Sequence, residues 1–173
     1  MDNHALAPLT LCHTKAGLAV GTTTTLTQTL AGGATSNIYS IMGKTYSAAA
    51  LSNTATPTTD WATGNAFLAV QPNQGCVFMV GFDHSGNLRA IQGQVNALDV
   101  NGNFLLAPQF GALGPSGSGS TDSDFCPIGY VVVKNGSAAS AWTFGASYFA
   151  GPPTGVTFAF QDVCGVTGRP QIS

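Results

Sequence analysis

Every acidic residue in this 173-residue sequence is an aspartate, and glutamate does not occur. Lysine and arginine together number only five, so charged residues make up 7% of the chain, against about 25% in an average soluble protein. Glutamate and lysine are strong helix formers that usually populate the exposed faces of helices. Their scarcity, together with 22 glycines and 9 prolines, predicts a chain built from strands and turns.

The length predicts one domain with a substantial hydrophobic core. Residues 1–35 form a Thr-rich lead, with threonine at every position from 22 to 25, and are expected to be an N-terminal arm or a first strand. An extended arm of this kind can add as a strand to a neighbour. Residues 36–173 are predicted to form the β-sandwich domain, in which the Gly- and Ser-rich stretch 111–123 is expected to be a mobile loop.

Short apolar segments separated by turn residues indicate about eight strands and no amphipathic helix. Near the end of the chain, Val156, Phe158 and Phe160 alternate with small or polar residues, which predicts a strand with one aromatic face packed near the centre of the core. The expected architecture is an all-β sandwich or jelly-roll-like barrel. Its predicted strands are 37–48, 66–71, 76–82, 88–95, 104–107, 128–134 and 156–161, with reversals at 83–87, Asn101-Gly102 and Asn135-Gly136.

Charge and cysteine usage limit the partners and the compartment. The five basic residues are scattered singly and the net charge is -2, so nucleic acid is not an expected partner. No apolar run reaches the roughly 18 residues that a membrane span requires. The four cysteines lack metal-site spacing and the first residues lack a secretion-signal pattern, which predicts cytosolic synthesis with free thiols; two disulfides are the alternative.

The segments that carry potential chemistry each lack a required part. Gly43-Lys44-Thr45 has the end of a phosphate-binding loop but not its first glycine. Cys12-His13 offers two metal ligands where three or four are needed. Asp83-His84-Ser85 has triad residue types, but neighbours in a tight turn point in different directions. The sequence therefore predicts no catalytic residue, no cofactor site and no metal site.

Two aspartate patterns have the same outcome. Asp99, Asn101 and Asn103 begin like a calcium loop, but the glycine comes too early and the closing glutamate is absent, so a plain Asn-Gly turn is expected. Asp122 and Asp124 could form a carboxylate pair, yet they lie in or beside the glycine-rich stretch and are expected to be solubilising charges. Neither pattern predicts a site.

Four segments of the chain resemble a group of small virion structural proteins of tailed bacteriophages. That group has a Y-x-I-x-G-K-x-Y strand, a D-x-S-G turn ending in a Q-G pair, and a C-x-I-G strand followed by a second glycine turn. The corresponding residues here are 39–46, 83–93 and 126–136, and the resemblance spans most of residues 38–163. The segments are IYSIMGKTYSAAALSN, FMVGFDHSGNLRAIQG, DFCPIGYVVVKNGSAA and TFAFQDV.

The resemblance implies a capsid cement or decoration protein that binds the major capsid protein on the outside of a head shell. It implies a homo-oligomer, with a trimer favoured, because quasi-threefold positions on such shells present three equivalent seams. The protein would then act in the virion, at the capsid surface, and not as an enzyme. Deleting residues 1–20 is expected to weaken docking more than folding.

Two alternatives remain open from the sequence. A tail, baseplate or head-fibre component would have the same Thr- and Gly-rich, β-rich composition. A carbohydrate-binding module would instead use exposed aromatic rings as a stacking platform, and the candidates are Trp61, Trp142, Tyr148 and Phe149. For that second alternative to hold, the stretch around Tyr148 must be exposed on a loop.

Overall fold

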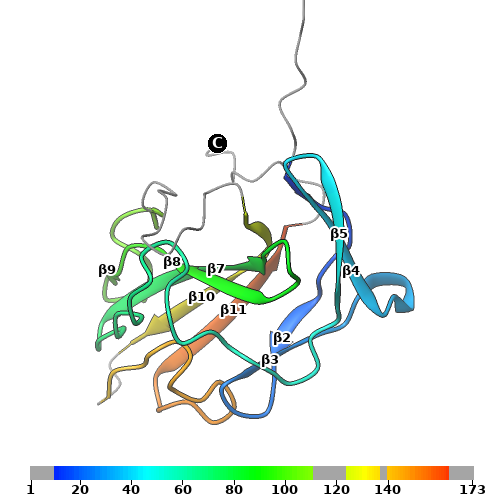
Figure 1. Cartoon of the computed structure of the whole chain (residues 1–173). Helices are drawn as coiled ribbons and strands as arrows, with labels where there is room; N and C mark the ends of the chain where they lie inside the picture. The colour runs from blue at the N-terminus through cyan, green and yellow to red at the C-terminus, as the bar shows by residue number, and fades with distance from the viewer. Residues whose placement is uncertain (1–9, 111–123, 137–139, 164–173) are drawn as a thin grey trace, which may run out of the picture.

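The computed structural model describes residues 10–110, 124–136 and 140–163, and these residues form three packed β-sheets with one short 3-10 turn, η1 (Ala31–Gly33), and no α-helix (Figure 1). The expected all-β fold class is confirmed. The packing of the sheets is consistent with a β-sandwich. This outcome follows from the composition, which supplies few helix formers and many turn residues.

The largest sheet has the order β11-β10-β7-β8, and all its pairs are antiparallel. The short strand β9 continues the β8 side of the sheet by pairing with the first residues of β7. The two central strands are long and apolar, because both of their faces are buried. The bounds are β7 (Gln74–Phe82), β8 (Leu88–Gln92), β9 (Asn96–Ala97), β10 (Cys126–Asn135) and β11 (Val156–Asp162).

Two smaller sheets complete the fold. One has the order β1-β4-β5 and the other β2-β3-β6. In the first, β4 and β5 form a tight hairpin whose two turn residues, Met42 (φ 51°) and Gly43 (φ 79°), both have positive φ. The bounds are β1 (Leu11–Cys12), β2 (Leu18–Val20), β3 (Thr25–Gln28), β4 (Ser36–Ile41), β5 (Lys44–Ala49) and β6 (Thr54–Ala55).

The main hydrophobic core contains residues from all three sheets. Alternate residues of β7, such as Phe78 and Val80, point into this core, whereas Val77 and Met79 join a second buried cluster on the opposite face of the sheet. The loop between β10 and β11 also contributes large side chains to the main core. Its buried aromatic residues are Trp142, Phe144 and Phe149.

Two of the predicted reversals and the predicted last strand are present in the structure. Residues 83–87 connect β7 to β8, and Asn101-Gly102 forms a turn that brings Leu98 into a bridge with Phe104. The strand predicted at 156–161 is β11. However, β11 is an edge strand and Phe158 and Phe160 are only partly buried, so its expected position near the centre of the core is wrong.

Four local predictions are also wrong. Residues 104–107 form a bridge at Phe104 but no strand. The strand expected at 37–48 is a hairpin, since the Met42-Gly43 turn divides it. Residues 66–71 form bridges at Ala66 and Val70 but no strand. Asn135-Gly136 does not form a tight hairpin, because Asn135 ends β10 and pairs with Val156 at the start of β11.

The Thr-rich lead divides into two parts. From Thr10 onward it supplies strands β1, β2 and β3, so the first-strand alternative applies there, and residues 1–9 lie outside the described residues. Cys12, Ala16 and Leu18 are buried, so a deletion of residues 1–20 would remove part of the core as well as any arm. The predicted loop 111–123 also lies outside the described residues.

Candidate functional site: the polar cluster at the β7–β8 turn

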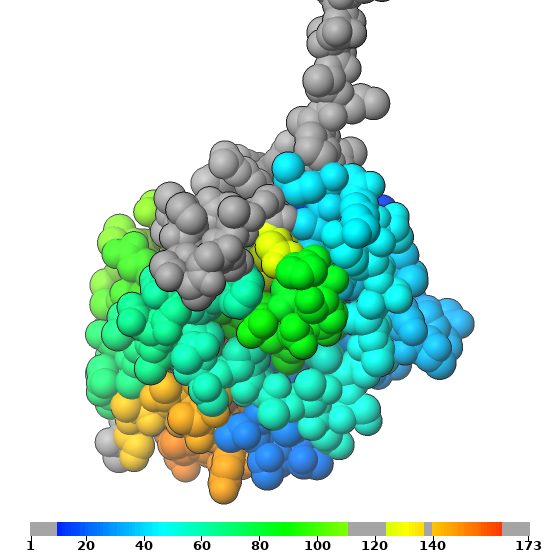
Figure 2. Space-filling model, viewed as in Figure 1, coloured from blue at the N-terminus to red at the C-terminus, as the bar shows by residue number. Residues whose placement is uncertain are grey.

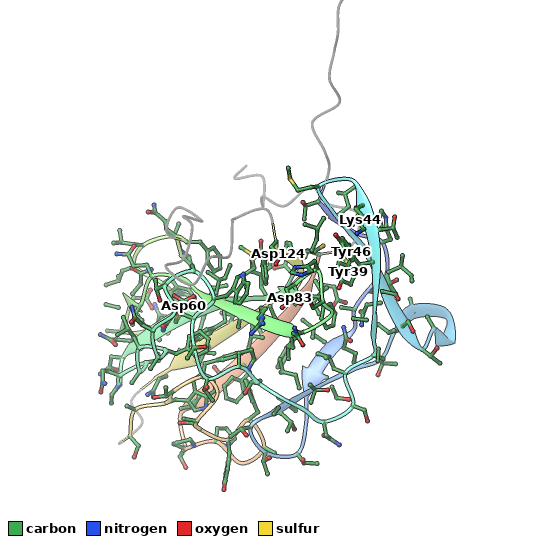
Figure 3. The ribbon with its side chains drawn as sticks, in the orientation of Figure 1. Tyr39, Lys44, Tyr46, Asp60, Asp83 and Asp124 are labelled. Atoms are coloured by element: carbon green, nitrogen blue, oxygen red, sulfur yellow. The ribbon has the colours of Figure 1, made fainter. Side chains whose placement is uncertain are left out.

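The densest group of polar contacts surrounds Asp83, in the turn between β7 and β8 (Figure 3). One carboxylate oxygen of Asp83 accepts hydrogen bonds from the backbone amides of Ser85 and Asn87, both at 2.9 Å. The other accepts the Asn87 side-chain amide at 3.0 Å. Gly86 has a φ of 79°, which glycine adopts without strain and which closes the turn.

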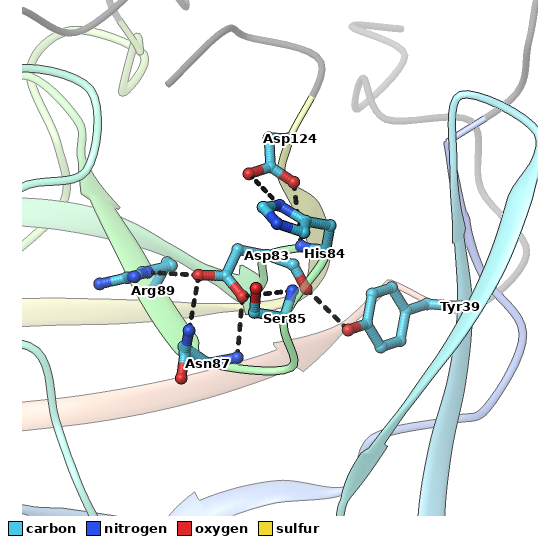
Figure 4. Close-up of polar contacts among 7 residues, drawn as sticks. All are labelled: Tyr39, Asp83, His84, Ser85, Asn87, Arg89 and Asp124. Carbon is cyan, nitrogen blue, oxygen red and sulfur yellow. Dashed lines mark hydrogen bonds and ion pairs between the residues drawn. The ribbon is translucent and has the colours of Figure 1, made fainter. Parts of the chain in front are cut away.

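The second oxygen of Asp83 also pairs with Arg89 Nε at 2.9 Å (Figure 4). The Asp83 side chain is only 3% exposed, so burial opposes its ionisation. The hydrogen bonds from Asn87 and Arg89, and the charge of Arg89, outweigh that effect and lower the pKa of Asp83. The Arg89 guanidinium in turn lies 4.2 Å from the centre of the Trp61 ring.

Tyr39 connects the cluster to the β1-β4-β5 sheet. Its hydroxyl donates to the backbone carbonyl of Asp83 at 2.7 Å, and the whole residue is buried. Burial, with a further contribution from the negative charge of Asp83, raises the pKa of Tyr39 to about 12. The phenol is therefore a hydrogen-bond donor that fixes two sheets together, and it is protonated throughout the physiological range.

His84 and Asp124 form a pair at the solvent-facing side of the cluster. Asp124 precedes β10 and accepts hydrogen bonds from the His84 backbone amide at 2.9 Å and from Nδ1 of its ring at 2.5 Å. The His84 side chain is 58% exposed and that of Asp124 is 20% exposed. Asp124 was expected to be a solubilising charge, and the structure instead places it as an anchor for the turn (Figure 4).

A carboxylate that orients an imidazole is one element of acid–base catalysis, but catalysis also needs a substrate-reacting partner and an enclosed site. Among the described contacts, Ser85 is linked to the cluster by its backbone amide, and Asp83 uses both oxygens to hold the turn. The arrangement is suited to joining β4, β7, β8 and β10. We therefore interpret it as a structural joint.

The turn at Asp99 repeats this pattern on the surface. The sequences Asp83-His-Ser-Gly-Asn87 and Asp99-Val-Asn-Gly-Asn103 share the first aspartate, the glycine and the last asparagine. Asp99 accepts the amides of Asn101 and Asn103 at 2.8 Å each, and the Asn103 side chain at 3.4 Å. The Asn103 amide is the main cause of a lowered pKa for Asp99. The expected plain turn is confirmed.

Asp60 is a buried carboxylate that the sequence interpretation did not single out. It accepts hydrogen bonds from the amides of Ala62 and Gln92, at 3.1 Å and 3.3 Å, and from the Thr63 hydroxyl at 3.0 Å. The sequence offered one local signal for this role: Asp60 lies two residues before Ala62, and an aspartate often accepts a hydrogen bond from the backbone amide two residues later. The hydrogen bond from the Gln92 amide joins Asp60 to β8, and sequence spacing could not predict it because the two residues are 32 positions apart.

Metal and thiol chemistry can be assessed for the described residues alone. In that part of the chain, no three His, Cys, Asp or Glu side chains are grouped as metal ligands, and Cys12 donates to the Thr14 carbonyl. Cys76 and Cys126 are free, buried thiols, so the alternative of two disulfides does not hold. Burial raises the pKa of each of these two thiols to about 12.

No described helix is long and apolar enough to cross a membrane.

The four aromatic residues proposed as a sugar-binding platform are not displayed together. Trp142 and Phe149 are buried in the core, and Trp61 is partly buried and covered on one face by Arg89. Tyr148 is 58% exposed beside an open hollow of about 440 Å³. The GASYFAG stretch thus exposes Tyr148 but not Phe149, which leaves this alternative with one freely exposed ring.

Comparisons with known proteins give no family assignment: no protein-family model, no curated protein and no solved structure matches this chain.

Proposed function

We propose that this chain is a cement or decoration protein that binds the outside of a bacteriophage capsid and stabilises the shell. The proposal rests on the resemblance of four sequence segments to small phage virion proteins. It is supported by the all-β fold and by a polar cluster whose contacts hold strands together. A tail, baseplate or head-fibre position is the competing assignment.

One observation carries the proposal furthest: the resembling segments meet at a single place in the fold. The first segment supplies Tyr39, the second supplies Asp83 and His84, and the third supplies Asp124. The third segment also forms β10, which lies between β7 of the second and β11 of the fourth. Residues far apart in sequence thus form one structural unit together. This supports the interpretation that the resemblance extends over the whole domain and is not a chance match of short motifs.

The mechanism would be the burial of apolar surface against capsid subunits. Leu105 and Leu106, which are 62% and 64% exposed, and the fully exposed Val100 lie close together in sequence after β9. Burial of such side chains contributes about 25 cal/mol per Å² of apolar surface. Many copies on a closed shell add their contributions, so weak individual contacts produce a stable coat.

The direct test is cosedimentation of the purified protein with expanded capsids that lack it. Saturable binding at a fixed number of copies per shell is the expected result. Absence of binding to heads, or binding to tails alone, would contradict the assignment to the capsid surface.

The exposed leucines supply a variant for the same assay. The double change Leu105→Ser and Leu106→Ser should weaken capsid binding by at least about tenfold, since burying one leucine contributes about 1.5–3 kcal/mol. Tyr148→Ser is the matched control, because it removes an exposed ring elsewhere. If Tyr148→Ser lowered retention on a glycan array while the leucine variant bound capsids normally, the carbohydrate-binding alternative would replace the proposal.

A further inference from the structure

Strand β5 forms an open edge of the β1-β4-β5 sheet. It is six residues long and lies at the end of the strand order, with β4 on its only paired side. Most of its side chains are exposed, and the region of β4 and β5 lies open on the surface in Figure 2. An unpaired strand edge presents backbone donors and acceptors that another chain can pair with.

The hairpin register identifies which backbone groups are available. Ile41 pairs with Lys44 across a two-residue turn, so alternate residues of β5 beginning at Lys44 bond to β4. The intervening residues, Thr45, Ser47 and Ala49, direct their amides away from β4. Within the described residues, no hydrogen bond from these three amides is present.

The edge also lacks most of the features that protect natural edge strands. It contains no proline and no bulge, and Lys44 at its start is its only charged residue. The Lys44 ammonium lies 5.2 Å from the centre of the Tyr46 ring. The outward amides of Thr45, Ser47 and Ala49 make no hydrogen bond within the described residues, and Gly86 of the β7–β8 turn packs beside Ser47 and Ala48.

The N-terminal segment leaves the described fold close to this edge. The Thr10 hydroxyl accepts a hydrogen bond from the Met42 amide at 3.2 Å, which holds the start of the described chain at the tip of the β4–β5 hairpin. At least nine residues precede Thr10. At about 3.3 Å per residue, nine extended residues span about 30 Å, whereas β5 is about 20 Å long. The segment can thus cross a gap and still pair along the whole edge.

A second copy is a better acceptor than the chain's own β5. Since β4 separates β1 from β5, pairing within one chain would require residues 1–9 to reverse around the hairpin tip. Donation from each copy to the next is a head-to-tail contact, and such contacts form a ring when the rotation between copies closes and a filament when it does not.

We propose that residues 1–9 of one copy add as a strand to the free edge of β5 in a neighbouring copy. This self-association does not depend on a capsid partner, so it goes beyond the proposed function. It would extend the three-stranded sheet β1-β4-β5 by one strand from the neighbour. It also specifies a contact from which the expected trimer could be built.

The test is photo-crosslinking in the full chain, with p-benzoylphenylalanine in place of Leu6. Equal amounts of ¹⁴N- and ¹⁵N-labelled protein are mixed, irradiated and analysed by mass spectrometry. The expected products join residue 6 of one isotope to the 45–49 region of the other. Crosslinks confined to a single copy, crosslinks to other surfaces, or no crosslinks would each overturn the proposal.

Proline substitution tests the edge itself. Ser47→Pro removes an outward amide, which an edge strand tolerates without losing its bonds to β4, and should reduce the mixed-isotope crosslink by at least about tenfold. Ser47→Ala retains the amide and should crosslink like the parent. Thr45→Pro provides a second block in case Ser47→Pro unfolds, and folding of each variant is checked by thermal unfolding. Undiminished crosslinking in a folded proline variant would also overturn the proposal.

Discussion

Asp83 and Asp99 occupy equivalent positions in two turns of the same sequence type, but only Asp83 is buried and ion-paired. Asp83→Ala would leave Arg89 and the turn amides without their acceptor. It is therefore expected to lower the free energy of unfolding by about 2–3 kcal/mol in urea denaturation. Asp99→Ala is the matched control and should have a clearly smaller effect. Equal losses from the two variants would show that burial of Asp83 is unimportant.

The lowered pKa of Asp83 also has a consequence for acid stability. A carboxyl whose pKa is lower in the folded than in the unfolded state stabilises the fold above its unfolded pKa, and that contribution is lost as the pH falls through the folded pKa. The parent protein should lose stability below about pH 4, and Asp83→Ala should lose less over the same range. Parallel pH profiles would contradict this role.

The buried thiols allow a simple chemical check. With pKa values raised to about 12, Cys76 and Cys126 have almost no thiolate at pH 8. Iodoacetamide at this pH should leave both unmodified in the native protein and alkylate both in urea, as mapped by peptide mass spectrometry. Rapid native labelling of either residue would mean that the β7–β10 region opens readily.

At the scale of elements, the close approach of β7 and β10 depends on a glycine. A Cβ atom on Gly81 would lie 2.1 Å from the carbonyl oxygen of Cys126, a backbone atom that cannot move aside. Gly81→Ala should therefore destabilise the protein by about 1–3 kcal/mol or more. Gly136→Ala is a suitable control, because its Cβ would meet only the Gly155 carbonyl at 3.4 Å. Chemical denaturation of both variants measures the difference.

Local sequence signals predicted the elements unevenly. The turns at 83–87 and Asn101-Gly102 were predicted because aspartate, asparagine and glycine form them through contacts within five residues. The β4–β5 turn was missed, since Met42 rarely adopts a positive φ and gives no turn signal. The buried Trp142 was assigned to a possible surface because its burial depends on tertiary packing against Phe78 of β7 and Phe158 of β11, which no local pattern reports.

The polar cluster around Asp83 was also only partly predictable from the sequence. The hydrogen bonds of Asp83 to Ser85 and Asn87 are local, and an aspartate-led turn was expected there. The contacts of this turn with Tyr39 and Asp124 join residues at least 40 positions apart. No spacing rule in a single sequence reports such contacts, because the first results from the packing of one sheet on another and the second from the pairing of β7 with β10.

For the whole molecule, three sheets share one core, and β5 is the edge strand that we propose takes part in assembly. Removing residues 1–9 should leave the thermal unfolding temperature within a few degrees of the parent value, since the buried core of the described residues is made by residues after Thr10. The same deletion should abolish self-association in sedimentation velocity. A large fall in the unfolding temperature would instead mean that these residues stabilise their own domain.

The function proposed for the whole molecule is the stabilisation of a shell. The most direct measurement is the dissociation temperature of expanded capsids lacking this protein, determined by calorimetry before and after its addition at saturation. If the protein cements the shell, the dissociation temperature rises in proportion to occupancy and the increase is reduced by the Leu105→Ser, Leu106→Ser variant. An unchanged dissociation temperature at full occupancy would contradict that function.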